Sequence, residues 1–237
     1  MHEVSNMNAE AHEASIEQSR RGVVVLCGGG SRRMGQDKAW LPFGEEAMLQ
    51  RVVRLAGEVA PISNVVIVAS AEQELPKLPG EVRIIRDAMD DQGPLPAVIA
   101  GLRTLLSAAD AALVVASDAP LLNTRAAAYL FDQLTGPRRA DNGQAPDAVV
   151  PSEPSRMYPL FGVYLTSCWA ALDVAMTLNQ LKGRGASLHG ALNAENSVNV
   201  LRLPIDELRA FDPKLHSLLN CNTPEEHQAA LAICETQ

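Results

Sequence analysis

The chain has 237 residues, of which 47% are hydrophobic and 20% are charged. This composition provides the apolar material for a sizeable core and excludes a wholly disordered chain. Lys and Arg total 20 against 28 Asp and Glu, so the formal net charge is −8, and the chain as a whole has no attraction for nucleic acid or for an anionic membrane. No apolar run approaches the roughly 20 residues of a membrane span.

The first 21 residues predict a flexible, polar extension. They hold four Glu and no apolar segment of the kind found in a secretory signal. The chain's four cysteines are scattered, without the spacing of a metal site or a redox motif, which predicts free thiols in a reducing compartment. We therefore expect a cytoplasmic protein. The cysteines are Cys27, Cys168, Cys221 and Cys234.

From residue 22 onward, short apolar runs alternate with segments of helical periodicity. The predicted strands are 22–26, 64–69, 82–85, 111–116, 148–150, 160–164 and 197–203. The predicted helices are 45–60, 96–109, 124–134, 167–181 and one that Thr223, Pro224 and Glu226 begin with a capping box. The alternation predicts an α/β fold, a Rossmann-like three-layer αβα sandwich with a mostly parallel sheet. Right-handed crossovers would gather the loops after the strands at one edge, where we expect the ligand.

The segment after the first predicted strand combines glycines with cations. Successive glycines let the backbone approach a ligand closely and form a nest of N–H groups that binds anions. Three cations and a hydroxyl donor coincide with them in an otherwise acidic chain, which indicates a site for a polyanion such as a nucleoside triphosphate. The alternative is a tight strand–helix turn with solvated cations, which we consider weaker. The residues are Gly28, Gly29, Gly30, Ser31, Arg32, Arg33 and Lys38.

Two better-known phosphate motifs do not fit this segment. Gly30 and Gly35 have the spacing of a Walker A loop, but Gln36 follows where that motif needs lysine. Gly28 and Gly30 could begin a dinucleotide fingerprint, but Arg33 occupies the third glycine position, where a helix must pack closely on the strand. The sequence therefore favours neither a P-loop NTPase nor a nicotinamide dehydrogenase.

Aspartates follow two of the predicted strands. Asp118 comes after 111–116, and Asp87 comes after 82–85 in the same way. A carboxylate at the carboxyl end of a strand faces the ligand crevice of an open α/β sheet, and Mg²⁺ is held by one or two carboxylates together with phosphate oxygens and waters. Asp118 is therefore a candidate Mg²⁺ ligand. An aspartate that caps the turn before Pro120 explains the same residue equally well.

Residues 26–38 resemble the nucleotidyltransferase signature of the molybdenum cofactor guanylyltransferases. They read Leu-Cys-Gly-Gly-Gly-Ser-Arg-Arg-Met-Gly-Gln-Asp-Lys. The adjacent Asp37 and Lys38 distinguish them from the isoprenoid cytidylyltransferases, in which Pro-Lys is usual, and Cys27 stands where the family has alanine. The resemblance runs from about residue 22 to about residue 231, and Ser-Asp-Ala-Pro at Asp118 is similar to the family's metal-binding segment.

This resemblance implies a nucleotidyltransferase fold of the GT-A-like type. It implies a single domain over 22–237, following the extension 1–21. Within that domain, nucleotide binding would fall to about 22–135 and acceptor binding to about 147–237.

The resemblance also implies roles for the matching residues. The catalytic residues would be Arg33, Lys38 and Asp118, with Asp118 as the Mg²⁺ ligand. The acceptor would be bound by Arg156, Asn220 and Asn222, in segments similar to the family's Arg/Asn-x-x-Pro-Leu and Asn-x-Asn-Thr-Pro-Glu-Glu. The nucleotide would be bound by Leu26, Cys27, Gly28, Gly29, Ser31, Arg33, Lys38, Asp87 and Asp118.

Some positions depart from the family or stay outside its pattern. The family often has an asparagine close to the base, at the end of the second strand, where this chain has Val68, Ala69 and Ser70. Arg184 is as well explained by a surface loop as by a phosphate contact, and a solvated turn explains Asp90 and Asp91. Three histidines have no neighbouring motif that would give them a catalytic partner, and we interpret them as surface or core residues. They are His189, His216 and His227.

The activity that the resemblance implies is transfer of GMP from GTP to the terminal phosphate of molybdopterin, with release of pyrophosphate. GTP and molybdopterin would be the substrates, Mg²⁺ the cofactor, and proteins of cofactor insertion or molybdoenzymes the candidate partners. The same reaction with CTP, or with a sugar phosphate as acceptor, is an alternative. A nucleotide-binding interaction module without catalysis is the alternative of another class.

Overall fold

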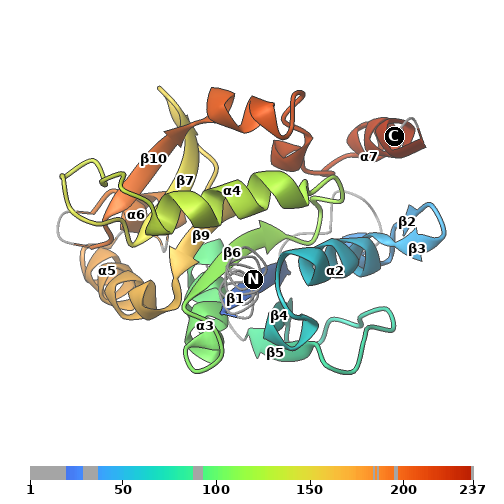
Figure 1. The fold of residues 1–237 in the computed structure, drawn as a ribbon. Helices are drawn as coiled ribbons and strands as arrows, with labels where there is room; N and C mark the ends of the chain where they lie inside the picture. Colours follow the sequence, from blue (N-terminus) through green and yellow to red (C-terminus); the bar gives the residue numbers. More distant parts are fainter. Residues whose placement is uncertain are drawn as a thin grey trace, which may run out of the picture.

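The computed structural model of the chain describes residues 20–28, 37–87, 93–183, 185, 187–194 and 197–235, with Asp87 described by its backbone alone. In these residues an eight-stranded sheet has the order β10-β7-β9-β6-β1-β4-β5, with β8 paired to β7 (Figure 1). The strands are β1 (Arg21–Cys27), β4 (Val65–Ser70), β5 (Arg83–Asp87), β6 (Ala111–Ala116), β7 (Ala148–Glu153), β8 (Arg156–Met157), β9 (Phe161–Leu165) and β10 (Val200–Pro204).

Helices cover both faces of this sheet, and a two-stranded hairpin lies beside it. The hairpin is β2 (Pro42–Phe43) with β3 (Glu46–Ala47), and it follows the short 3₁₀ helix η2 (Lys38–Trp40). The α-helices are α2 (Met48–Val59), α3 (Pro94–Leu105), α4 (Thr124–Thr135), α5 (Trp169–Leu181), α6 (Leu188–Leu192) and α7 (Pro224–Glu235).

The alternation of side chains along β1 explains the three layers. Val23 and Val25 belong to the core cluster beneath α2 and α4, whereas Val24 belongs to the cluster beneath α3, α5 and α6. A strand that is buried on both faces needs apolar residues at every position, which β1 has. Gly101 brings α3 close to the sheet, because a Cβ there would lie 2.3 Å from Cγ1 of Val24.

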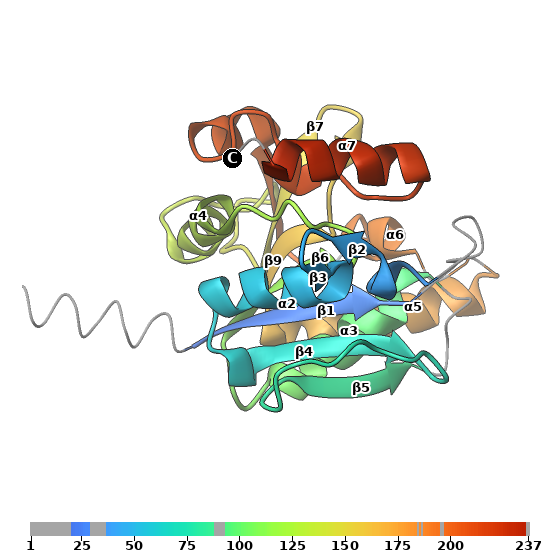
Figure 2. The same ribbon diagram turned by 90° about the vertical axis from the view of Figure 1, so that its right-hand side faces the viewer.

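The sheet is mostly parallel, as the sequence predicts. Strand β1 pairs in parallel with β4 and β6, and β4 pairs in parallel with β5, whereas β9 runs antiparallel to β6 and β7. The parallel strands β1, β4 and β5 therefore end side by side (Figure 2). In register, Cys27 lies opposite Ala69, and Ser70 lies opposite Asp87. This edge collects the loops that the sequence assigns to the ligand.

Several boundaries differ from the predicted ones for local reasons. The predicted helix 45–60 begins at Met48, because Gly44 takes a left-handed turn (φ 66°) and the residues around it form the β2–β3 hairpin. Helix α3 begins at Pro94, where the proline ring suits the first helical turn. The hairpin, β8 and α6 were not predicted, since two to five residues are too few to show a period.

Helix α7 begins as predicted and packs on the hairpin. The N–H groups of Asn222 and Thr223 donate to Oε2 of Glu226, and the N–H of Glu226 donates to Oγ1 of Thr223, which is the reciprocal bonding of a capping box. A separate apolar cluster joins α7 to the hairpin through Phe43 and Ala230. The four cysteines are free, as expected.

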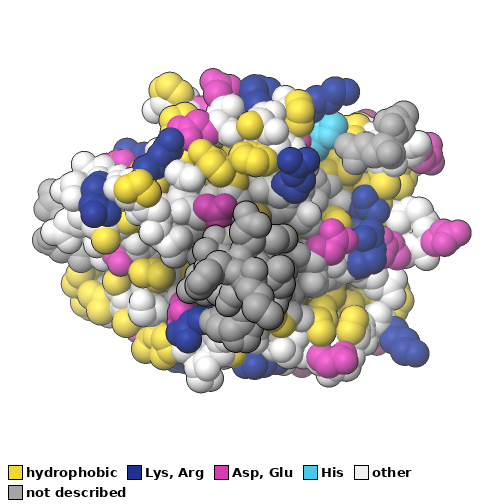
Figure 3. Space-filling model, viewed as in Figure 1, with side chains coloured by type: hydrophobic (Ala, Val, Ile, Leu, Met, Phe, Trp, Pro, Cys, Tyr) yellow, Lys and Arg dark blue, Asp and Glu magenta, His cyan; other side chains and the backbone are white. Residues whose placement is uncertain are grey.

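The surface on the side of Figure 1 mixes both signs of charge. Lys and Arg side chains lie among Asp and Glu side chains rather than in one basic area (Figure 3). In the part of the chain that the structure describes, no helix has the length and apolarity needed to cross a membrane.

Candidate active site

Lys38, Asp118 and Asn222 meet at the carboxyl edge of the sheet. The Nζ of Lys38 donates to Oδ2 of Asp118 at 2.8 Å and to Oδ1 of Asn222 at 2.9 Å. The side chains of Lys38 and Asp118 are 15% and 13% exposed, so this ion pair is largely removed from water. Three segments that lie far apart in the sequence thus converge at this edge.

The second oxygen of Asp118 is buried without a donor. Within the described residues, Oδ1 of Asp118 has no hydrogen-bond partner. A buried, unpartnered carboxylate oxygen is costly, and a cation would satisfy it. No group of three or more His, Cys, Asp or Glu side chains gathers into a metal site among those residues. The donor set thus fits an ion that takes one protein carboxylate and completes its shell with phosphate oxygens and waters, as Mg²⁺ does.

Backbone and side-chain contacts hold these three residues in place. Asp37 caps η2 by accepting the N–H of Ala39 at 2.9 Å, which fixes the turn that carries Lys38. Arg51 of α2 donates to the carbonyl of Pro120 at 2.8 Å, and so ties down the turn that contains Asp118. The N–H of Cys221 donates to the carbonyl of Asp118 at 2.8 Å, which brings the segment before α7 to the same turn.

The predicted nucleotide-binding residues are described in part. Leu26 and Cys27 are buried at the end of β1, and Gly28 is exposed just beyond it. Burial raises the pKa of the Cys27 thiol to about 11, so at neutral pH this group is a neutral thiol and not a nucleophile. For Asp87 the backbone at the end of β5 is described. The predicted residues that lie outside the described ranges are Gly29, Gly30, Ser31, Arg32, Arg33, Asp90, Asp91 and Arg184.

The end of β4 holds the three residues that stand where the family often has an asparagine. Val68 and Ala69 are fully buried in the two core clusters, so neither side chain faces the edge. Ser70 is half-buried at the last position of the strand. In the loop after β4, Gln73 reaches the residue before Lys38, because its Nε2 donates to both carboxylate oxygens of Asp37 at 3.0 and 2.8 Å. Sequence reasoning missed Gln73.

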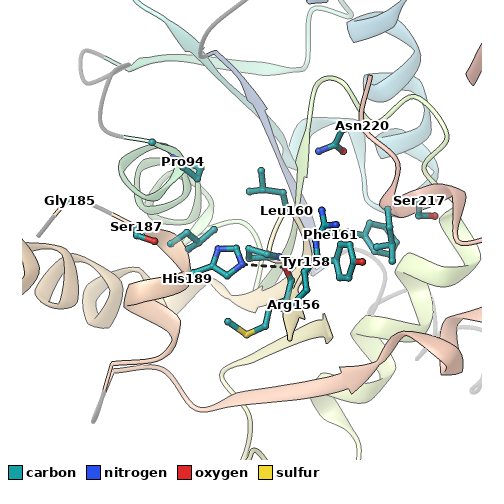
Figure 4. Close-up of a pocket in the computed structure, with 15 residues that line it drawn as sticks. Pro94, Arg156, Tyr158, Leu160, Phe161, Gly185, Ser187, His189, Ser217 and Asn220 are labelled. Atoms are coloured by element: carbon teal, nitrogen blue, oxygen red, sulfur yellow. Dashed lines mark hydrogen bonds between the residues drawn. The ribbon is translucent and has the colours of Figure 1, made fainter. Parts of the chain in front are cut away.

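A second feature of the same edge is a cavity of about 460 Å³. Arg156, His189 and Asn220 reach it from three separate segments (Figure 4). The guanidinium carbon of Arg156 lies 4.6 Å from the centre of the Tyr158 ring, an arrangement that holds the cation over an aromatic face. Gly93, with φ 78°, also lines the cavity at the start of α3, where that left-handed backbone suits glycine.

The structure therefore separates the predicted acceptor residues into two places. Arg156 and Asn220 line the cavity, whereas Asn222 bonds Lys38 two residues further along. His189 joins Arg156 in the cavity, with Nε2 at 3.3 Å from the carbonyl of Met157, and is a candidate that sequence reasoning missed. His227 is a buried packing residue, since its Nε2 lies 2.8 Å from the carbonyl of Pro42.

Comparisons with known proteins show the family of this chain. The family model described as the MobA-like NTP transferase domain matches residues 23–184. A protein of Pelotomaculum thermopropionicum named probable molybdenum cofactor guanylyltransferase is 32% identical over 212 residues, which cover 90% of this chain and 92% of that protein. A protein of the same name from Methanosarcina mazei is 29% identical over 228 residues, covering 93% and 94%.

Solved structures show the same fold. The crystal structure of molybdopterin-guanine dinucleotide biosynthesis protein A from Archaeoglobus fulgidus has a TM-score of 0.68 and 24% identity, and the match covers 92% of this chain and all of that one. The crystal structure of 2-C-methyl-D-erythritol 4-phosphate cytidylyltransferase from Thermus thermophilus has a TM-score of 0.54 and 18% identity, covering 91% and 99%. Both support the expected α/β sandwich of nucleotidyltransferases.

Proposed function

Because this chain belongs to the MobA-like NTP transferase family, we propose that it transfers GMP from GTP to the terminal phosphate of molybdopterin and releases pyrophosphate. Two relatives that match it over nine-tenths of its length carry the name of this activity. The observation that carries the proposal is the meeting of Asn222 with the largely buried pair of Lys38 and Asp118. This pair offers a cation, and a carboxylate oxygen without a hydrogen-bond partner among the described residues, where the predicted phosphate segment ends.

The transfer is a displacement at the α-phosphorus of GTP. An oxygen of the acceptor's phosphate forms the new bond to that phosphorus, while the bond to the bridging oxygen of the β-phosphate breaks and pyrophosphate leaves with the electron pair. Because the attacking oxygen is already anionic, no side chain has to remove a proton. Catalysis then requires positioning and neutralisation of charge. Lys38 provides the positive charge, and Asn222 orients its ammonium group.

Asp118 is the residue that would hold Mg²⁺. When bound, such an ion neutralises charge on phosphate oxygens and helps to orient them. Lys38 engages Oδ2 of Asp118 at 2.8 Å, and Oδ1 has no hydrogen-bond partner among the residues that the structure describes, so Oδ1 is the oxygen that would take the ion. Arg51 and the N–H of Cys221 hold the turn that carries this carboxylate, because both donate to backbone carbonyls of the turn.

The cavity beside this cluster suits the acceptor. It presents the Arg156 guanidinium for a phosphate, and its wall includes the aromatic ring of Tyr158 and the apolar side chain of Leu160, which suit a flat heterocycle. Asn220 lines the cavity while Asn222 contacts Lys38, so one short segment spans the acceptor and the phosphate groups. This continuity supports a single site in which the two substrates meet.

Pyrophosphate release with each of the four nucleoside triphosphates tests the proposal. The assay contains molybdopterin, Mg²⁺ and GTP, CTP, ATP or UTP, and we expect turnover with GTP to exceed the others by at least about tenfold. Preference for CTP would correct the base while leaving the reaction class intact. Nucleotide binding without pyrophosphate from any of the four would instead indicate a binding module.

Replacing Lys38 by alanine gives the sharpest variant. We expect turnover to fall about 10²–10³-fold, as for the loss of one charge-stabilising donor in a transition state. The protein should melt at a somewhat lower temperature, because the pair is largely buried and the substitution leaves the Asp118 carboxylate without its cation, so turnover is measured well below the melting transition. Lys77→Ala is the matched control, since Lys77 is an exposed lysine. Turnover equal to that of the unaltered protein would remove Lys38 from the mechanism.

A further inference from the structure

Gln73 contacts the residue at the carboxyl end of the glycine-rich segment. Its Nε2 donates to Oδ1 and Oδ2 of Asp37, the residue that immediately precedes Lys38. Asp37 in turn caps η2 by accepting the N–H of Ala39 with its Oδ1. One side chain thus holds the carboxylate that caps the turn carrying Lys38.

The loop that carries Gln73 is itself anchored on three sides. Oε1 of Gln73 accepts the N–H of Ser70 at 3.3 Å, which fixes the amide's orientation relative to β4. From β5, the Arg86 guanidinium donates to the carbonyls of Ser70 and Gln73 at 3.0 and 2.6 Å. The indole Nε1 of Trp40 in η2 donates to the carbonyl of Glu74 at 3.0 Å. The loop therefore connects the ends of β4 and β5 to the turn that contains Lys38.

We propose that Gln73 is a positioning residue that holds Asp37, a contact that we call the clamp, and so fixes the placement of Lys38. The role in turnover rests on the proposed function, because it assumes that Lys38 acts on the triphosphate. The clamp itself rests on geometry. Oδ1 of Asp37 accepts hydrogen bonds from the N–H of Ala39 and from Nε2 of Gln73. A displacement of Asp37 would therefore release the first turn of η2 and move Lys38 with it.

The chemistry of the pair also explains why residue 73 carries an amide. Asp37 is an acceptor of hydrogen bonds, and Ser70 presents an N–H donor, so residue 73 must donate on one side and accept on the other. The Gln side chain does both. A glutamate at 73 could still accept from Ser70, but it would place a second carboxylate against Asp37, and like charges in contact repel.

Exchanging the two partners tests the clamp. Gln73→Glu should lower turnover at saturating GTP by about tenfold or more, and Asp37→Asn should lower it by about two- to fivefold. The double variant Gln73→Glu/Asp37→Asn restores an amide facing a carboxylate and should return to within about threefold of the unaltered protein, since residues in contact couple non-additively. Losses that multiply in the double variant would overturn the proposal.

A second measurement does not depend on catalysis. Amide hydrogen exchange of residues 39–41 should be about tenfold faster in Gln73→Glu than in the unaltered protein, and the double variant should reverse this. Glu72→Ala, an exposed neighbour on the same loop, should leave both exchange and turnover unchanged. Unchanged exchange in Gln73→Glu would also overturn the proposal. Absence of pyrophosphate from the unaltered protein would instead contradict the proposed function, while the exchange data would still decide the clamp.

Gln73→Ala removes the donor without adding charge. It serves if the glutamate variant does not fold, which a thermal melt establishes first. We expect its η2 amides to exchange faster and its turnover to fall, although less than in Gln73→Glu. If Gln73→Ala matched Glu72→Ala in both hydrogen exchange and turnover, Gln73 would fill space without positioning Asp37 or Lys38.

Discussion

The two oxygens of Asp118 have different environments, and this difference has a consequence for metal binding. Oδ2 is paired with Lys38, while Oδ1 is buried and has no donor within the described residues. An unsatisfied buried acceptor costs about 1–3 kcal/mol. A cation bound at Oδ1 would satisfy this acceptor, so we expect Asp118 to set the requirement for a divalent ion.

The substitution Asp118→Asn tests whether this carboxylate binds the metal ion. The amide keeps the shape of the side chain but removes its charge, so we expect the Mg²⁺ concentration for half-maximal turnover to rise at least about tenfold. Titration of pyrophosphate release with MgCl₂ measures the effect, and a chelator should abolish turnover of the unaltered protein. Asp206→Asn, at an exposed carboxylate, is the control. An unchanged Mg²⁺ requirement in Asp118→Asn would place the metal elsewhere.

Cys27 provides a prediction about pH. Burial raises the pKa of its thiol from 9.0 to about 11. A raised pKa means that the neutral thiol persists to higher pH, so at pH 8 about one molecule in a thousand carries the reactive thiolate. We expect iodoacetamide to leave Cys27 unmodified in the folded protein at pH 8, with mass spectrometry of peptides as the readout and the urea-unfolded protein as the positive control. Rapid labelling of folded protein would contradict both the burial and the raised pKa.

At the scale of elements, the strands could be predicted because burial on both faces leaves an unbroken apolar run. The six residues of β6, Ala111–Ala116, show this, and Asp118 could be placed at the sheet edge because it follows such a run. The β2–β3 hairpin could not be predicted, since its pairing depends on one left-handed glycine, Gly44, and on contacts with α7.

The site shows the same division. Lys38 follows a recognisable motif, and its placement against Asp118 follows from parallel strands ending together. Gln73 and His189 stand in segments of no special composition, and they reach the site through the course of a loop and through α6. Contacts of that kind come from tertiary structure, and a single sequence carries no signal for them.

Helix α7 links stability to activity through its first turn. Glu226 accepts the N–H groups of Asn222 and Thr223 at 2.7 and 3.0 Å, and Asn222 in turn accepts from Lys38. Glu226→Ala should therefore lower the free energy of unfolding by about 1 kcal/mol and the melting temperature by about 2–4 °C. It should also reduce turnover several-fold. Gln228→Ala, exposed on the same helix, should do neither. If Glu226→Ala lost stability but kept full turnover, Asn222 would not need its hydrogen bond to Glu226 in order to act on Lys38.

At the scale of the molecule, the two parts of the chain that we predict to bind the nucleotide and the acceptor, about 22–135 and 147–237, share their cores. The cluster beneath α2 and α4 contains Val23 from β1 and also Val149 and Leu203 from β7 and β10. The cluster on the opposite face likewise joins Val24 to Leu172 of α5. Strand β9 lies between β6 and β7 and pairs with both. Neither half can therefore bury its apolar surface without the other.

This sharing predicts cooperative unfolding of the whole sheet. In differential scanning calorimetry we expect one transition, with the calorimetric enthalpy equal to the van't Hoff enthalpy, because loss of either half exposes both clusters. GTP with Mg²⁺ should raise that single transition, since a ligand that binds the folded state stabilises all that unfolds with it. Two resolved transitions, of which the nucleotide shifts one alone, would show instead that the halves are independent folding units and that their contact across β6 and β9 is secondary.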